Sequence, residues 1–142
     1  MTSSATPAGE IAPIAVIAAH GELAAGLVSA VEAITGRGAL FVPLTNRDLG
    51  PPELEALIAT WVDRGVRVVF TDLPAGSTTI CARRLQRAHP ELVVVTGASL
   101  AALLAFALAA DKGAEEAARL AAEKARAALQ VSGGAPAPAA GG

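Results

Sequence analysis

Short runs of consecutive apolar residues alternate along the chain with longer segments whose apolar residues recur at helical spacing. The apolar runs cover residues 13–19, 39–45, 66–71 and 92–96 and are predicted to be β-strands. The helical segments cover residues 22–34, 52–63, 77–88, 100–110 and 114–130. Alternating strands and helices predict βαβ units, and strands without a polar face are typical of a parallel sheet buried on both sides.

We therefore predict an α/β protein with a small doubly wound, flavodoxin-like parallel sheet, strand order 2-1-3-4, and helices on both faces. In this topology a crevice opens at the carboxyl ends of the first and third strands, which is where ligands bind. The domain is expected to cover residues 11–131. Residues 1–10 are predicted to be a flexible leader, and the Gly-, Ala- and Pro-rich residues 132–142 a flexible tail.

Hydropathy raises the alternative of a membrane protein. The 142 residues are 53% hydrophobic, and residues 92–110 carry no charge over a length that could span a bilayer. The sequence TGAS at 96–99 divides this run into a β-branched half and an Ala/Leu half, which favours strand, turn and helix. With one cysteine, Cys81, and no basic segment before the first apolar run, we expect a cytoplasmic protein.

Charge and aromatic content argue against nucleic-acid binding. The formal net charge is −2, and the chain has no Tyr, three Phe and one Trp, so both a basic face and a stacking surface are missing. The two histidines and one cysteine are far apart, so metal-ligand spacing is absent. No glycine-rich nucleotide motif follows any predicted strand.

Two chemically capable residues follow the strands that border the crevice. His20 follows the first predicted strand and Asp72 the third. Because neighbouring strands are about 4.8 Å apart, the Asp72 carboxylate can hold one imidazole nitrogen and leave the other as a nucleophile. The turn containing Gly76, Ser77 and Thr78 opens a helix and forms a natural anion seat. This combination predicts phosphoryl transfer through a phosphohistidine. In the simpler interpretation, His20 is a solvated strand-end residue and Asp72, Ser77 and Thr78 are ordinary caps.

Three blocks of the sequence resemble the enzyme IIA component of mannose-family sugar phosphotransferase systems (PTS). They are IAVIAAHGELAAGLVSAVEAITG, FTDLPAGSTTICARRL and VVVTGASLAALLAFAL. In that family the corresponding blocks are a strand followed by His-Gly, an Asp-x-x-Gly-Gly-Ser turn before a helix, and a Val-x-x-Gly-Val-Asn-Leu-Pro turn. The three blocks occur in the family's order and cover most of residues 11–110.

The resemblance implies a phosphohistidine carrier. His20 would accept a phosphoryl group from the carrier protein HPr and pass it to a IIB subunit, with Asp72 holding Nδ1. Gly76, Ser77, Thr78 and neighbouring amides would bind the phosphoryl oxygens, without a metal or other cofactor. The membrane would be involved only through the permease. The resemblance also implies a homodimer that exchanges a C-terminal edge strand, for which residues 127–131 are the candidate.

The chain departs from the family pattern at the rim of this site. Departures that leave the transfer rate and the IIB partner open are Ala75, Thr78, Ile80, Ser99 and Ala101. One alternative is the similar phosphotransfer subunit of dihydroxyacetone kinases, although His20-Gly21 and Gly76-Ser77 favour the sugar system. Another is a regulatory module that keeps the fold without sugar transport. The sugar itself is not specified by this chain.

Overall fold

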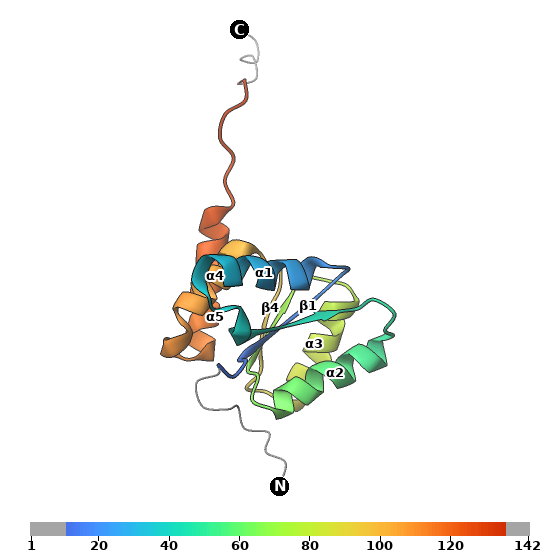
Figure 1. The fold of residues 1–142 in the computed structure, drawn as a ribbon. Helices are drawn as coiled ribbons and strands as arrows, with labels where there is room; N and C mark the ends of the chain where they lie inside the picture. The colour runs from blue at the N-terminus through green and yellow to red at the C-terminus, as the bar shows by residue number, and fades with distance from the viewer. Residues whose placement is uncertain (1–10, 136–142) are drawn as a thin grey trace.

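A computed structural model describes residues 11–135 of the chain (Figure 1). The strands are β1 (Ala15–Ala19), β2 (Phe41–Thr45), β3 (Val68–Thr71) and β4 (Val93–Val95). The helices are α1 (Leu23–Thr35), α2 (Pro51–Asp63), α3 (Ser77–Ala88), α4 (Leu100–Leu108) and α5 (Ala114–Ala128). Two 3-10 turns are η1 (Gly38–Leu40) and η2 (Ala110–Lys112). The leader predicted for residues 1–10 and the last seven residues of the predicted tail, 136–142, lie outside the described residues.

The strands form one four-stranded sheet in the order β2-β1-β3-β4, and all three pairings are parallel. This confirms the predicted fold class and strand order. The register pairs Ala19 with Thr45 on one side of β1 and Ala18 with Thr71 on the other. The carboxyl ends of β1, β2 and β3 therefore lie at the same edge, and the loops that follow them are neighbours.

Helices cover both faces of the sheet, as Figure 1 shows. Helices α1, α4 and α5 pack on one face, over a core that includes Ile17, Phe70 and Phe106. Helices α2 and α3 pack on the other face, over a core that includes Val69 and Ile58. Side chains of successive strand residues point to opposite faces, and both faces are apolar here. This explains why the strands read as unbroken apolar runs in the sequence.

Several predicted boundaries differ from the structure by one or two residues. Residues 39–40 belong to η1 instead of β2, because the Leu40 N–H donates to the Arg37 carbonyl and is not available to the sheet. The uncharged run at 92–110 is divided into β4, a turn and the nine-residue α4, as predicted. Among residues 11–135, no helix has both the length and the apolar character needed to cross a membrane.

The candidate edge strand at residues 127–131 is not a strand in this single chain. Helix α5 continues through Ala128, and Leu129 and Val131 follow as exposed, irregular backbone. The Ala-, Glu- and Arg-rich sequence of α5 consists of strong helix formers, so its last turn remains helical. The outer edge of β4 borders a groove of about 590 Å³, whose other wall is α5.

Candidate active site

The parallel register brings His20 and Asp72 together. Ala18 pairs with Thr71 across β1 and β3. His20 lies two residues after Ala18, and Asp72 directly follows Thr71. The His20 Nδ1 atom lies 2.7 Å from Asp72 Oδ2, and the His20 backbone N–H donates to the same oxygen at 3.0 Å. The Asp72 side chain is only 8% exposed, whereas that of His20 is 46% exposed. The carboxylate is thus held inside the crevice while the imidazole reaches solvent.

The protonation state of Asp72 fixes the tautomer of His20. Burial by itself raises the pKa of Asp72, but hydrogen bonds from the His20 backbone and ring, together with its own backbone N–H and the charge of His20, lower it overall. An ionised carboxylate only accepts hydrogen bonds, so the proton between the two side chains belongs to Nδ1. In a neutral His20 ring, the lone pair is therefore on Nε2.

The lowered pKa of Asp72 predicts a pH dependence of stability. Between its folded-state pKa and the ordinary value of 3.8, the unfolded state binds more protons than the folded state. The stabilisation by the carboxylate is therefore complete above about pH 4 and is lost as the pH falls through the folded-state pKa. In urea unfolding, the wild type should lose more stability than Asp72→Asn in this acid range. Parallel pH profiles for the two proteins would contradict the prediction.

Three threonines brace the loop that carries Asp72. Thr78 is buried, and its hydroxyl donates to Asp72 Oδ1 at 3.2 Å, opposite the oxygen that receives His20. The buried hydroxyls of Thr71 and Thr79 lie 2.7 Å apart, and that of Thr79 also donates to the Leu73 carbonyl. Thr71 and Thr79 were not expected from the sequence. The one signal for Thr71 is that it is a polar residue at the end of an apolar strand, and Thr79 has no distinguishing signal in a helix that is rich in polar residues.

The turn from Asp72 to α3 has the geometry of an anion seat. Gly76, with φ +114° and ψ 177°, is the N-cap of α3, and it has no side chain to occupy the free backbone N–H groups of the first turn. The first intrahelical bond runs from the Ile80 N–H to the Gly76 carbonyl. Ser77 is half-buried at the first helical position. The hydroxyl of Thr78 is already used by Asp72, so any contact of Thr78 with an anion would involve its backbone N–H.

Substitution by alanine should change the stability of the protein in opposite directions at two glycines, Gly76 and Gly26. The φ and ψ of Gly76 fall in a region that is essentially restricted to glycine, so Gly76→Ala should destabilise the protein by about 1–3 kcal/mol. Gly26 lies inside α1, and a Cβ added there meets nothing within 4 Å. Gly26→Ala should therefore stabilise by about 0.5–1 kcal/mol. Urea unfolding of both variants provides the measurement, and shifts of the same sign would refute this interpretation.

Of the five departures from the family pattern, Thr78 bonds to Asp72, and the other four make no side-chain hydrogen bond to His20 or Asp72 in the described part of the chain. Ala75 does not adopt a positive φ, because the positive value falls on Gly76 instead. Ile80 is 51% exposed on α3. Ser99 is the N-cap of α4, where its hydroxyl accepts from the Ala102 N–H at 3.2 Å. Ala101 lies on α4, in a shallow apolar groove that α4 forms with α5.

Clustered metal ligands are not found in the part of the chain that the structure describes. Within residues 11–135, no three His, Cys, Asp or Glu side chains are close enough to share an ion. Cys81 is buried, and its Sγ–H donates to the Pro51 carbonyl at 3.4 Å. Burial, followed by the charge of Glu55, raises the pKa of the Cys81 thiol. A buried thiol that donates to a backbone carbonyl is typical of a small core residue.

Several solved structures of phosphotransferase system proteins resemble this chain in fold. EIIA from Streptococcus agalactiae gives a TM-score of 0.73 at 17% identity, covering 82% of this chain and 95% of that chain. The mannose/sorbose specific IIA subunit from Enterococcus faecalis gives 0.73 at 21% identity, covering 90% and 100%. The IIA protein associated with the fucose utilization operon from Streptococcus pneumoniae gives 0.65 at 19% identity, covering 84% and 96%.

No family model and no curated protein matches the sequence. The structural likeness supports the fold predicted from the alternation of strands and helices, a doubly wound sheet of order 2-1-3-4. At these identities it establishes the fold alone. The case for a chemical function therefore depends on the geometry of His20 and Asp72.

Proposed function

We propose that the chain is a phosphocarrier of a phosphoenolpyruvate-dependent sugar phosphotransferase system. It accepts a phosphoryl group from phospho-HPr on His20 and passes it to a IIB component. The observation that carries this proposal is the 2.7 Å contact between His20 Nδ1 and a nearly buried Asp72 carboxylate. That contact leaves Nε2 as the free nitrogen of a ring that is about half exposed.

The proposed transfer needs only these two side chains and the turn before α3. The Nε2 lone pair of His20 attacks the phosphorus of the donor phosphohistidine, and a new N–P bond forms. The donor N–P bond breaks, and its electron pair returns to the donor imidazole. His20 keeps its proton on Nδ1 and becomes a cationic phosphoimidazole ring, whose charge Asp72 stabilises. Transfer to IIB is the same exchange in reverse, with a IIB nucleophile as the acceptor.

The turn at Gly76 and Ser77 supplies the complementary part of the proposed site. Free backbone N–H groups at the start of a helix bind anions, because they donate hydrogen bonds and lie at the positive end of the helix dipole. Gly76, Ser77 and the backbone of Thr78 would contact the phosphoryl oxygens during transfer. Such donors stabilise the developing charge, so the mechanism requires no metal or other cofactor.

The proposal includes a homodimer, a cytoplasmic location, and contact with a membrane only through the permease. The open edge of β4 and its groove with α5 offer a place for a strand from a second chain, formed by residues 127–131. In the single chain the last two residues of α5 would have to unwind for that exchange. Sedimentation of the purified protein would test for the dimer.

The direct test is phosphorylation from phosphoenolpyruvate through enzyme I and HPr. We expect the mass of one phosphoryl group, acid-labile and base-stable, with fragmentation placing it on His20. Addition of a mannose-type IIB domain should then remove the group from the chain. A wild-type protein that acquires no label would refute the carrier proposal. A phosphoryl group that is not transferred to IIB but is transferred to the nucleotide-binding subunit of dihydroxyacetone kinase would favour a phosphotransfer subunit of that kinase. A phosphoryl group that is transferred to neither protein would favour a regulatory module.

A further inference from the structure

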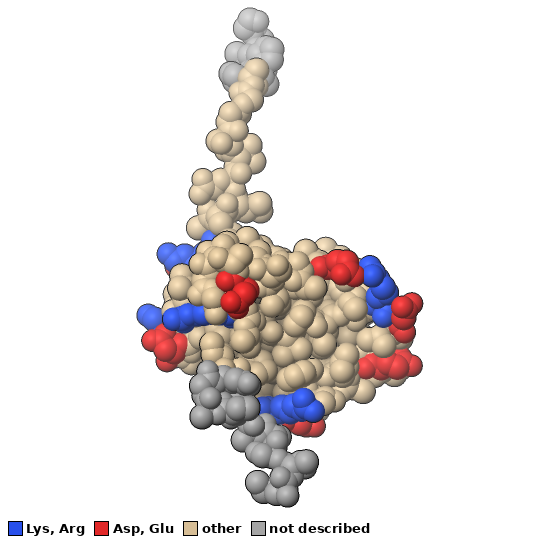
Figure 2. Space-filling view, viewed as in Figure 1, with Lys and Arg blue, Asp and Glu red and all other residues tan. Residues whose placement is uncertain are grey.

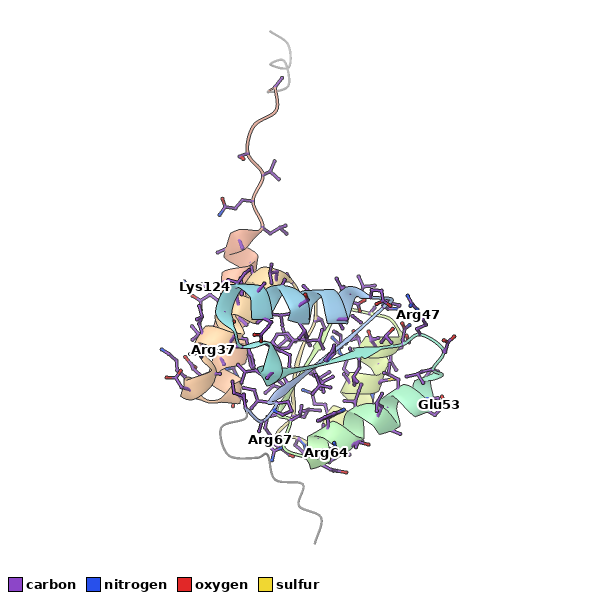
Figure 3. All side chains as sticks on the ribbon, in the orientation of Figure 1. Arg37, Arg47, Glu53, Arg64, Arg67 and Lys124 are labelled. Atoms are coloured by element: carbon purple, nitrogen blue, oxygen red, sulfur yellow. The ribbon has the colours of Figure 1, made fainter. Side chains whose placement is uncertain are left out.

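A guanidinium lies over the residue that follows His20. Arg47 belongs to the loop after β2, and its Nη1 is 2.7 Å from Glu22 Oε1. A Cβ built on Gly21 would lie 3.7 Å from Arg47 Nη2, so the guanidinium borders the space that a side chain at residue 21 would occupy. Figure 3 shows Arg47 at the edge of the sheet where β2 ends and α1 begins. The loop after β2 thus extends to the His20 loop.

The backbone of this loop is held in one conformation. The Asn46 N–H donates to the Ala19 carbonyl at 3.3 Å, and the Leu49 N–H closes the turn on the Asn46 carbonyl at 3.1 Å. Asp48 has φ +61° and is the one non-glycine residue with a positive φ in the part of the chain that the structure describes. Asp tolerates this conformation better than most residues, and such backbone occurs often at functional sites. The loop therefore fixes the position of the Arg47 backbone.

The side chain of Arg47, in contrast to its backbone, is free to change conformation. Arg47 is 56% exposed and Glu22 is 78% exposed. Ion pairs between exposed side chains contribute little net stability, so the pair is easily exchanged for a stronger one. Figure 2, in the same orientation, shows basic atoms at this edge with acidic atoms on both sides. In the unphosphorylated protein, the Arg47 guanidinium is thus paired with the Glu22 carboxylate in a weak ion pair.

Phosphorylation of His20 would place a stronger competitor beside this pair. A phosphoryl group carries up to two negative charges and three acceptor oxygens, and an arginine fork matches such an anion better than it matches one carboxylate oxygen. We propose that Arg47 is a phosphoryl-binding residue that exchanges Glu22 for the phosphoryl group on His20 Nε2. This inference rests on the proposed function and adds a residue to its site. The exchange also leaves Glu22 unpaired at the rim of the phosphorylated form.

The exchange predicts opposite effects from the two partners of one ion pair. The quantity to measure is the phosphorylated fraction of the chain at a fixed ratio of phospho-HPr to HPr, read from intact-protein mass spectra. Arg47→Gln should lower the transfer equilibrium constant by about threefold to tenfold, and Arg47→Lys should restore part of it. Glu22→Gln should raise the constant by about twofold to fivefold, because it releases Arg47 from its competitor.

A second ion pair, between α3 and α2, serves as a control. Arg84 Nη1 lies 4.0 Å from Glu55 Oε1, with side-chain exposures of 60% and 33%. Arg84→Gln and Glu55→Gln should leave the equilibrium constant unchanged. Equal shifts of the same sign in Arg47→Gln and Glu22→Gln, or no shift in either, would overturn the role of Arg47 while leaving the carrier function intact. A wild-type chain without any label would overturn both.

Discussion

Substitution of His20 by Ala should abolish phosphoryl transfer from phospho-HPr, with a loss of at least about 10⁴-fold, because the attacking atom is removed. Nε2 of this ring is the nitrogen that Asp72 leaves unprotonated. The hydroxyls of the adjacent turn do not replace it, because a hydroxyl at neutral pH is a weak nucleophile. The Thr78 hydroxyl does donate to Asp72, but it is buried, and a carboxylate with a lowered pKa is a weak base. The rate of label incorporation from phospho-HPr is the measurement.

The other histidine supplies a matched control. His89 is the C-cap residue of α3, its side chain is 31% exposed, and its Nδ1 lies 3.8 Å from Glu91 Oε1. His89→Ala should label at the wild-type rate. His20→Ala removes one hydrogen bond to the nearly buried Asp72 carboxylate but leaves those from the His20 backbone N–H and from Thr78, so the variant should stay folded with a stability loss of about 1–2 kcal/mol. Labelling that survives in His20→Ala but disappears in His89→Ala would identify His89, at the C-terminal end of α3, as the acceptor and would refute the assignment to His20.

The juxtaposition of His20 and Asp72 could be predicted because it depends on topology alone. Apolar runs that alternate with helical segments give a parallel doubly wound sheet, and order 2-1-3-4 makes β1 and β3 neighbours. Any residues that directly follow those two strands must then share one edge. No knowledge of side-chain conformation is needed to place both residues at that edge. The structure confirms this placement, and there His20 Nδ1 lies 2.7 Å from Asp72 Oδ2.

The position of Arg47 depends on one loop conformation, so the sequence leaves two alternatives open. Within the turn Asn46-Arg47-Asp48, Arg47 could lean toward the crevice, but an ordinary turn residue is the favoured interpretation. Its position over Gly21 follows from the positive φ of Asp48 and from the Asn46 bond to β1, neither of which has a pattern in the sequence. The same holds for Thr71 and Thr79, whose hydroxyls meet only after α3 has packed against the sheet.

Replacement of Asp72 should slow the transfer without removing the nucleophile, by about 10-fold to 10²-fold in Asp72→Asn and by about 10²–10⁴-fold in Asp72→Ala. Oδ2 of Asp72 accepts from both the His20 ring and the His20 backbone N–H, and Oδ1 faces the Thr78 hydroxyl. An Asn therefore keeps its carbonyl oxygen at the Oδ2 position and turns its NH2 group toward the Thr78 hydroxyl, which can accept as well as donate. The ring proton stays on Nδ1, but the charge that stabilises the phosphorylated ring is lost. Asp72→Ala loses both the charge and the tautomer preference, so we expect it to be slower than Asp72→Asn.

The tautomer gives a readout that a purely structural role of Asp72 would not change. In the wild type and in Asp72→Asn, ¹⁵N NMR of labelled histidine should show the proton of neutral His20 on Nδ1, whereas Asp72→Ala should show a mixture of the two tautomers. Asp111, exposed in η2, is the matched control, and Asp111→Asn should leave both tautomer and transfer rate unchanged. If the ring proton moves to Nε2 in Asp72→Asn and this variant transfers more slowly than Asp72→Ala, the amide donates to the ring and the predicted order is wrong. An Asp72→Ala variant that keeps the proton wholly on Nδ1 and transfers at the wild-type rate would refute the positioning role of Asp72.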